Sequence, residues 1–400
     1  MKKILNISNL YILLWSLYTL QGVLLPVGSL VSQSIFVVLM LISLYYAYEF
    51  HQSYKVTKYF KAVGLLLVMF IVYGVVLLMY GQDVNGLKVV NDHTYLQYTL
   101  MSFIPIYPFY IFSRQGLINK NVLFIWLFVF VVALTLNYFN LEQHIMEEEG
   151  WEETINNIAY IFIVILPLIC LFDDKKGIQY ALWAYCAFFI ISSFKRGAML
   201  IGAICFIMFM FHSLKSVKFG GKLLIIIATT VIVFIGYQYI MGLMETSELF
   251  NRRLDETMEG DSSGRDSLYA TFWNIFINQE NPWKFLIGYG ANGTLAWAGQ
   301  YAHNDWLELA IDQGLLGIII YINYWRCSLQ TWREIRKANT VDSNIGFVLG
   351  MTIFIAFAKS LFSMSFTNTP FYVSLIIGYC LAQYDKQEPS SIEISHSDVS

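Results

Sequence analysis

A histidine and an asparagine lie where a long polar stretch meets an apolar one. His303 and Asn304 are followed, within the same apolar run, by Gly314 and Gly317. An imidazole changes its charge near neutral pH, so it can take up or release a proton under physiological conditions. Polar groups close to hydrocarbon must find partners, which makes a His–Asn pair at such a junction costly. We therefore treat these two residues as the first candidate site.

Two further groups of residues could bind an anion. Lys195 and Arg196 form a basic pair between two apolar runs, and Arg265 opens a helical pattern after a Gly-Asp-Ser-Ser-Gly turn. A guanidinium group can bind two oxygens of one anion at once, without a metal ion. The sequence therefore combines candidate anion-binding groups with a titratable imidazole.

The elements that must position these residues are membrane helices. Hydrophobic residues make up 57% of the chain and charged residues 13%, which excludes an ordinary soluble globular protein. Apolar runs near the ~20 residues needed to cross a bilayer recur about twelve times. They cover residues 9–30, 34–50, 59–80, 94–113, 121–138, 155–172, 177–194, 197–213, 222–243, 305–327, 344–365 and 370–384. The predicted fold is an all-α, polytopic transmembrane bundle of about 12 spans.

The positions of Lys and Arg predict the orientation of these spans. Basic residues fall on alternate connecting segments, and cytoplasmic loops are those that carry the excess. Both termini are then cytoplasmic, and residues 244–304 lie outside. Lys195 and Arg196 break this pattern, because they fall on an external connection. We interpret a charge that violates the topology rule as one retained for chemistry.

The apolar runs divide the chain into four parts. Residues 1–243 hold transmembrane helices 1–9, residues 244–304 form one large external loop with short helices, residues 305–385 hold helices 10–12, and residues 386–400 form a disordered cytoplasmic tail. The external loop contains a glycine-rich turn around Tyr289 and Gly290, where the backbone can approach a ligand closely. Asp312 and Lys359 each lie about two turns inside a span and could meet as an ion pair.

Several functions are disfavoured by what the sequence contains. The basic residues are distributed as topology determinants and are not gathered into one patch, so nucleic acid is not an expected partner. The five cysteines show no paired spacing, which indicates neither a disulfide framework nor a metal site. No internal repeat is visible, which weakens an interpretation as a transporter built from duplicated halves.

Three segments carry a resemblance to a known family. The pattern HN-x9-GxxG, formed by His303, Asn304, Gly314 and Gly317, resembles the signature of the O-antigen ligase and polymerase superfamily of integral membrane glycosyltransferases. Residues 192–197 resemble the arginine motif of that family, and residues 265–290 resemble its loop pattern of Arg, aromatic helix, Pro and GxG. The three matches occur in the family's order and cover roughly residues 190 to 320.

The resemblance implies an enzyme of the bacterial cytoplasmic membrane that acts on its outer face. The donor would be a glycan carried on a polyprenyl diphosphate, and the acceptor a glycan or lipid-core hydroxyl. His303 is then the candidate general base, and Arg196 and Arg265 are candidates for binding the diphosphate. Further substrate contacts are assigned to Asn304, Lys195, Tyr289, Gly290 and Arg253. No cofactor or metal ion is implied; membrane lipids, a flippase and a chain-length regulator are further candidate partners.

Each of these residues also has a simpler structural role open to it. A lone histidine near a helix end is usually a capping or interfacial residue, and Arg196 could extend to lipid head groups. Arg253 could be a surface charge or a lipid contact, and Gly314 and Gly317 could simply allow close helix packing.

Two alternative function classes are also compatible with a polytopic chain. One is a flippase for lipid-linked glycans, and the other is a non-catalytic partner of a polysaccharide export complex. A flippase should show polar residues across the whole membrane, whereas here they gather toward one face. A non-catalytic partner would not require a base beside arginines that bind phosphate.

Overall fold

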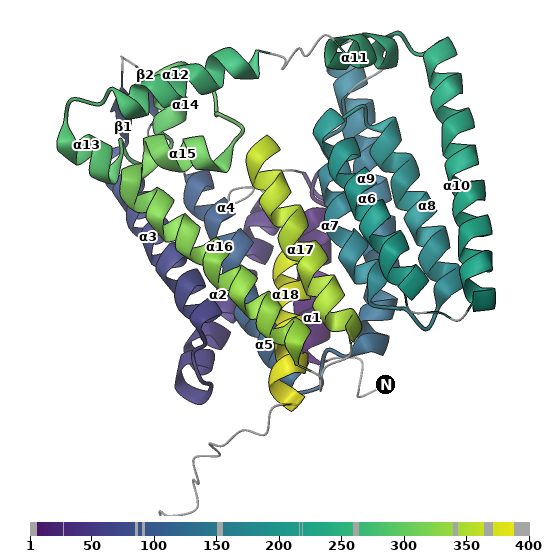
Figure 1. Cartoon of the computed structure of the whole chain (residues 1–400). Coiled ribbons are helices and arrows are strands. Elements are labelled where there is room, and N and C mark those ends of the chain that lie inside the picture. The colour runs from purple at the N-terminus through teal and green to yellow at the C-terminus, as the bar shows by residue number, and fades with distance from the viewer. Residues whose placement is uncertain are drawn as a thin grey trace, which may run out of the picture.

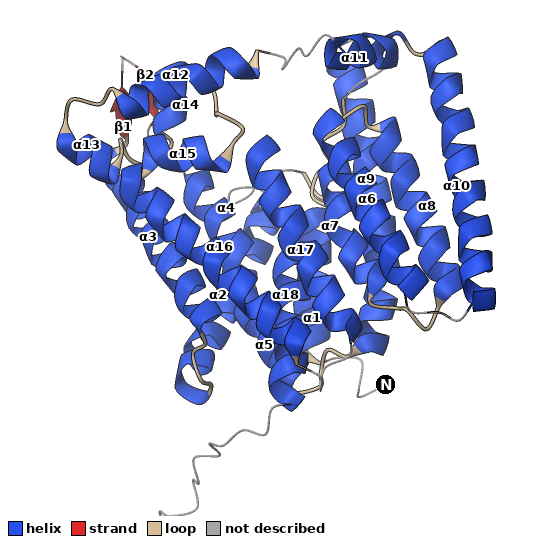
Figure 2. Cartoon of the chain, in the orientation of Figure 1, coloured by secondary structure: helices blue, strands red, loops and turns tan. Residues whose placement is uncertain are grey.

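The computed structural model describes residues 6–26, 28–84, 87–89, 93–149, 155–215, 217, 219–258, 264–338, 343–363 and 371–387. Helices dominate these residues, which also contain a small antiparallel hairpin (Figure 2). The helices are α1 (Ile7–Thr19), α2 (Leu30–Ser53), α3 (Lys58–Tyr80), α4 (His93–Phe103), α5 (Ile106–Arg114), α6 (Lys120–Glu149), α7 (Ala159–Cys170), α8 (Lys176–Ser192), α9 (Arg196–Lys215), α10 (Phe219–Thr246), α11 (Glu248–Met258), α12 (Arg265–Ile277), α13 (Pro282–Ile287), α14 (Gly293–Ala298), α15 (Asp305–Asp312), α16 (Gly314–Lys337), α17 (Ser343–Phe362) and α18 (Phe371–Gln387). The hairpin strands are β1 (Gln82–Val84) and β2 (Leu87–Val89). The predicted helical class is confirmed.

Six of the described helices are long and apolar enough to cross a membrane, judged by length and composition: α2, α3, α6, α9, α10 and α17. The apolar helix α7 is shorter. The larger number of about 12 crossings therefore stays a prediction. The disordered tail predicted from residue 386 lies outside the described residues, except that Lys386 and Gln387 close α18.

Two of the predicted apolar runs divide into two helices, and a third, 9–30, is helical only as far as Thr19 before α2 begins at Leu30. Residues 94–113 form α4 and α5, which meet next to Pro105, a residue that has no backbone N–H to continue a helical ladder. Residues 305–327 form α15 and α16, which meet at Gln313. Hydrophobic periodicity does not reveal either break, because apolar residues continue on both sides.

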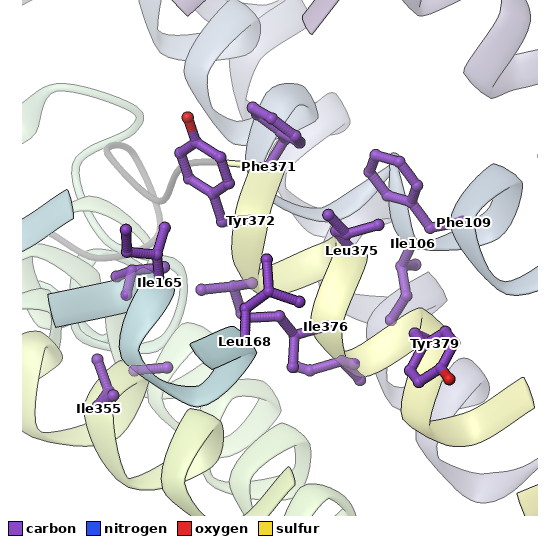
Figure 3. Close-up of a cluster of buried hydrophobic side chains, with 14 of the residues drawn as sticks. Ile106, Phe109, Ile165, Leu168, Ile355, Phe371, Tyr372, Leu375, Ile376 and Tyr379 are labelled. Atoms are coloured by element: carbon purple, nitrogen blue, oxygen red, sulfur yellow. The ribbon is translucent and has the colours of Figure 1, made fainter. Parts of the chain in front are cut away.

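The core lies at the centre of the bundle, where α7 and α18 are enclosed by other helices (Figure 1). Figure 3 shows how Ile165 and Leu168 of α7 face Leu375 and Ile376 of α18. All four side chains are buried. Lipid tails are as apolar as these side chains, so within a bilayer their contribution comes from close van der Waals packing and not from removal from water. These two helices hold the parts of the bundle together.

The segment after α11 folds into a cap at one end of the bundle. We define the cap as α12–α15 together with the β1–β2 hairpin, and Figure 1 shows it above the ends of α3 and α16. Its own small core is buried and consists of Phe272, Phe276, Ala302, Ala310 and Ile311. Helix α15 thus belongs to the cap and does not continue into α16 as one span.

Glycines make the break between α15 and α16 possible. Gly314 has φ +65°, a left-handed conformation that favours glycine, and a Cβ atom on it would lie 2.5 Å from the backbone nitrogen of Gly288. A Cβ atom on Gly288 would lie 2.3 Å from the backbone oxygen of Asp312. The two glycines therefore let the loop at Gly288 pack directly against the break between α15 and α16. This contact favours a packing role for Gly314.

The break also changes the partners of the charged residues in this region. Asp312 accepts hydrogen bonds from the backbone N–H groups of Asn292 (3.0 Å) and Thr294 (3.2 Å). Lys359 interacts electrostatically with Asp305, and Tyr321 donates to the same carboxylate at 2.8 Å. The predicted ion pair between Asp312 and Lys359 is therefore wrong, because α15 turns away from the axis of α16 and carries Asp312 into the cap.

Candidate functional site

His303 occupies a loop that ends in the first turn of α15. Its φ is +53°, an uncommon left-handed conformation for a residue with a side chain, and its side chain is exposed. The next residue, Asn304, caps α15 by accepting hydrogen bonds from the N–H groups of Trp306 (2.9 Å) and Leu307 (3.2 Å). The hydrogen bonds of Asn304 therefore fix where α15 begins, immediately after His303.

The C-terminal end of α17 connects His303 with Arg265. The side-chain amide of Asn304 donates to the backbone oxygen of Leu361 at 3.1 Å, and Arg265 donates from Nη1 to that of Phe362 at 3.1 Å. The last carbonyl groups of a helix lack partners within it and carry partial negative charge, so a cation is favourable there. Tyr269, one turn after Arg265, donates to the backbone oxygen of His303 at 3.5 Å.

Lys195 and Arg196 enter the same region from the tight turn between α8 and α9. Phe194 has φ +53° in this turn, and Arg196 is the first residue of α9. Gly197 leaves room here for the hydroxyl of Tyr160, which would lie 2.5 Å from a Cβ atom at this position. The turn therefore presents two successive cations beside the N-terminal part of α7.

The charges of these side chains act on one another. Burial and the positive charges of Arg265 and Arg253 lower the pKa of Lys195 to about 8. Partial burial, with the positive charges of Arg265 and Lys195, lowers the pKa of His303 below its ordinary value. We call Lys195, Arg196, Arg253 and Arg265 the basic cluster. Its members come from three separate segments. Arg265 and Lys195 act on the imidazole of His303, Arg253 acts on Lys195, and Arg196 shares Glu256 with Arg253.

Glu256 is a residue of this site that the sequence analysis did not single out. Its carboxylate lies 2.8 Å from Nη1 of Arg253 and 3.7 Å from Nη2 of Arg196, and Arg252 approaches it at 4.0 Å. A carboxylate held by several guanidinium groups indicates that the cluster can bind oxygen anions. Its sequence signals are the i, i+3 spacing from Arg253 and the i, i+4 spacing from Arg252, both of which are common on solvated helices.

Tyr289 and Gly290 lie in a different part of the cap. The N–H groups of Tyr289 and Gly290 donate to the backbone oxygens of Ile311 and Asp312 at the end of α15. Gln82 of β1 donates to the backbone oxygen of Tyr289 at 2.5 Å. The Lys284 ammonium group lies 4.6 Å from the centre of the Tyr289 ring. These contacts link the turn to the end of α15, whereas the basic cluster is near its beginning. A role of these two residues in substrate binding stays a prediction.

Two buried carboxylates on α15 hold the chain that precedes this helix, and Glu308 holds the part that carries His303. Glu308 accepts a hydrogen bond from the N–H of Ala302 at 2.5 Å and another from the hydroxyl of Thr294, and it also interacts with the backbone N–H of His303. Asp312, one turn later, holds the backbone at Asn292 and Thr294. The signal in the sequence is an acidic pair at i, i+4 inside an apolar run. Burying two carboxyl groups there is costly unless both find hydrogen-bond partners.

Among the described residues, no group of three or more His, Cys, Asp or Glu side chains is arranged to hold a metal ion. The positive charge described at this site comes from the Lys and Arg side chains of the basic cluster. The chemistry that this arrangement offers is the binding of an oxygen anion next to a histidine that is neutral at physiological pH.

Comparison with known proteins supports the resemblance found in the sequence. Residues 181–322 match the model of a family described as O-antigen ligase. The match includes all three motif segments, so the resemblance to the O-antigen ligase and polymerase superfamily is confirmed over these residues. No curated protein sequence matches the chain. With its candidate membrane spans, the chain is a helical membrane protein similar to glycosyltransferases of the O-antigen ligase and polymerase type.

Proposed function

We propose that this protein transfers a glycan from a polyprenyl diphosphate donor to an acceptor hydroxyl during the assembly of a surface polysaccharide. The observation that carries the proposal is the gathering of the basic cluster around His303, from segments separated by up to about a hundred residues of chain. A diphosphate needs several cations close together, and the attacking hydroxyl needs a proton acceptor beside them.

The reaction would proceed by displacement at the anomeric carbon. The acceptor oxygen forms a bond to that carbon while the bond from carbon to diphosphate oxygen breaks, and the imidazole of His303 accepts the hydroxyl proton. The leaving diphosphate gains negative charge, which the guanidinium groups of Arg196 and Arg265 stabilise. Lys195 and Arg253 add positive charge, and Asn304 positions the histidine. No step in this scheme needs a metal ion, so a chelator should leave turnover unchanged.

The proposed reaction takes place on the outer face of the cytoplasmic membrane. The distribution of Lys and Arg over the connecting segments supports this orientation, with about 12 crossings and both termini in the cytoplasm. The basic pair Lys195 and Arg196 is then retained on the external side for its role with the diphosphate. The cap and the end of α6 would lie on that same side.

Topology can be tested with single cysteines. Thr271→Cys in α12 and Glu334→Cys near the end of α16 both replace exposed residues at opposite ends of the fold. In intact cells, a thiol reagent that does not cross the membrane should label the first variant and not the second. Disruption of the membrane should allow both to react. Labelling of Glu334→Cys alone would place the cap in the cytoplasm and refute the proposed orientation.

Glu308 should act as a positioning residue in this reaction. Glu308→Ala removes the acceptor that holds the backbone at Ala302 and His303, and we expect kcat to fall about 10-fold to 100-fold while the KM for the donor stays similar. Glu308→Gln keeps one acceptor oxygen and should recover part of the loss. The matched control is Asp312→Asn, since the described hydrogen bonds of Asp312 go to the backbone at Asn292 and Thr294 and not to that of Ala302 or His303. Equal losses of kcat in Glu308→Ala and the control, at equal thermal stability, would contradict this role.

The choice between a polymerase and a ligase depends on the acceptor, which is another repeat unit for a polymerase and a lipid core or other carrier for a ligase. We favour the polymerase slightly. The decisive experiment is to delete the gene and analyse the lipid-linked intermediates and the surface glycan. A polymerase mutant should accumulate single repeat units, some attached to the acceptor, whereas a ligase mutant should accumulate long chains on the lipid carrier. Purified protein that forms no glycosidic bond from a polyprenyl diphosphate donor and either acceptor would refute the proposed activity.

A further inference from the structure

A cavity lies on the other side of α7 from the basic cluster. It has a volume of about 670 Å³ and lies between α1, α4, α6, α7 and α18. We call it the polar cavity. Part of its wall is apolar, but it also presents hydrogen-bonding groups and aromatic rings from several helices, among them Tyr98, Asn137, Asn140, His144, Glu147 and Tyr372.

The lining of the polar cavity has the chemistry of a site for sugars. A sugar presents hydroxyl groups that both donate and accept hydrogen bonds, and it presents apolar C–H faces that pack on aromatic rings. Amides such as that of Asn140 can do both, and Tyr98 offers a ring that is 45% exposed. Among the described residues that line the cavity, none is Lys or Arg, and one is Glu147. A diphosphate or another anion would therefore find no Lys or Arg among the described residues there.

A buried hydroxyl provides a second indication of a ligand. The Tyr372 side chain is completely buried, and its hydroxyl makes no hydrogen bond of ordinary geometry to the described residues. It interacts with the side chain of Thr19, whose own hydroxyl donates to the backbone oxygen of Ser16. Figure 3 shows the hydroxyl pointing away from the apolar cluster of Leu168 and Ile376. A buried hydroxyl that is only weakly paired is costly, and a sugar hydroxyl in the polar cavity could give it a further partner.

The first turns of α7 separate the polar cavity from the basic cluster. Ile158 and Ile161 line the cavity, whereas Tyr160 lies close to Gly197 and interacts electrostatically with Arg265. Just before α7, the N–H of Asn156 donates to the backbone oxygen of Ser193 at 3.0 Å, in the turn that presents Lys195 and Arg196. The two sites are therefore neighbours at the same end of the bundle.

We propose that the polar cavity binds sugar residues of the acceptor glycan, close to the end that receives the new unit. The inference rests on the proposed transfer reaction, which needs an acceptor held beside the basic cluster. In this arrangement the diphosphate and the acceptor sugars occupy different sites, one cationic and one composed of amides and phenols. The position of the second site, one helix away, would let a hydroxyl of the bound glycan reach the donor.

Direct binding of oligosaccharides to the full-length purified protein tests the proposal. The probes are oligosaccharides of one, two and three repeat units, released from the producing cells' own polysaccharide and carrying no diphosphate. Calorimetry or saturation-transfer NMR should give saturable binding to the wild-type protein. Tyr98→Ala should weaken this binding up to about tenfold by removing a stacking surface. Tyr372→Phe, which changes the fold least, should weaken it by about threefold to tenfold through the loss of one hydrogen bond.

Two controls separate this site from the proposed reaction. Tyr237→Ala removes a similarly exposed ring from α10, far from the polar cavity, and should bind the oligosaccharides as the wild type does. Arg265→Ala should also bind them normally while losing transfer. If Tyr98→Ala and Tyr372→Phe bound as tightly as Tyr237→Ala, or if the wild-type protein bound none of the probes, the inference would be overturned. If both variants bound more weakly but the wild-type protein transferred no glycan, the sugar site would stand and the proposed reaction would fall.

Discussion

Replacing His303 should lower glycan transfer about 10²-fold to 10⁴-fold, the usual contribution of a general base. The protein should still fold and insert, because the imidazole is exposed and the loop is held through backbone groups. Since His303 has φ +53°, His303→Asn is a better variant than His303→Ala. Asparagine tolerates this left-handed conformation and cannot act as a base at neutral pH. Transfer rates with purified protein and a synthetic polyprenyl diphosphate donor would measure the loss, and near-normal turnover by either variant would exclude His303 as the base.

The dependence of the rate on pH should report the same imidazole. Only the neutral form can accept a proton, and the surroundings of His303 lower its pKa below the ordinary value of 6.5. Activity should therefore persist as the pH falls to about 6.5 and decline only at lower pH. Lys195→Gln removes one of the nearby positive charges, so it should raise the pKa of His303 and move the decline to higher pH. An acidic decline at the same pH in both proteins would contradict this electrostatic link.

Changing Arg196 or Arg265 to lysine should reduce transfer although the charge is preserved. Lysine cannot bind two diphosphate oxygens with one planar group, and the loss of one charged hydrogen bond corresponds to about 1.5–3 kcal/mol, or roughly 10-fold to 100-fold in rate. Changing either residue to glutamine should cause a larger loss. The measurement is transfer at equal amounts of folded protein.

The matched control for these variants is Arg252→Lys, because the Arg252 side chain is 54% exposed and approaches Glu256 at 4.0 Å. It should retain most of its activity. Arg265 also donates to the backbone oxygen of Phe362, so its variants need a parallel measurement of thermal stability. Arg196→Lys is the cleaner test, because a lysine can keep the charge contact that Arg196 makes with Glu256 at 3.7 Å. Full transfer by both lysine variants would show that paired binding by guanidinium groups is not part of the mechanism.

Much of the candidate site could be predicted from local sequence patterns. The apolar composition and the recurrent long apolar runs determine a helical membrane protein, because the backbone in a bilayer must satisfy its hydrogen bonds within helices. The three motif segments indicate the likeness to the O-antigen ligase family, whose model matches residues 181–322. These predictions depend only on residue type and spacing along the chain.

The remaining features were decided by contacts between distant segments. The break at Gln313 depends on Gly288 and Gly314 packing together, and it transfers Asp312 from a predicted ion pair to the loop at Asn292. Glu256 joins the site because a separate helix brings it to Arg196, whereas Glu308 reaches the backbone of His303 from the helix that follows directly. Hydrophobic periodicity reports which face of a helix is buried, but it does not say what that face meets. Sequence alone therefore determined the class of protein and its reactive groups, whereas the tertiary structure decided which groups lie together, because burial of a charge is tolerated only where another segment supplies its partner.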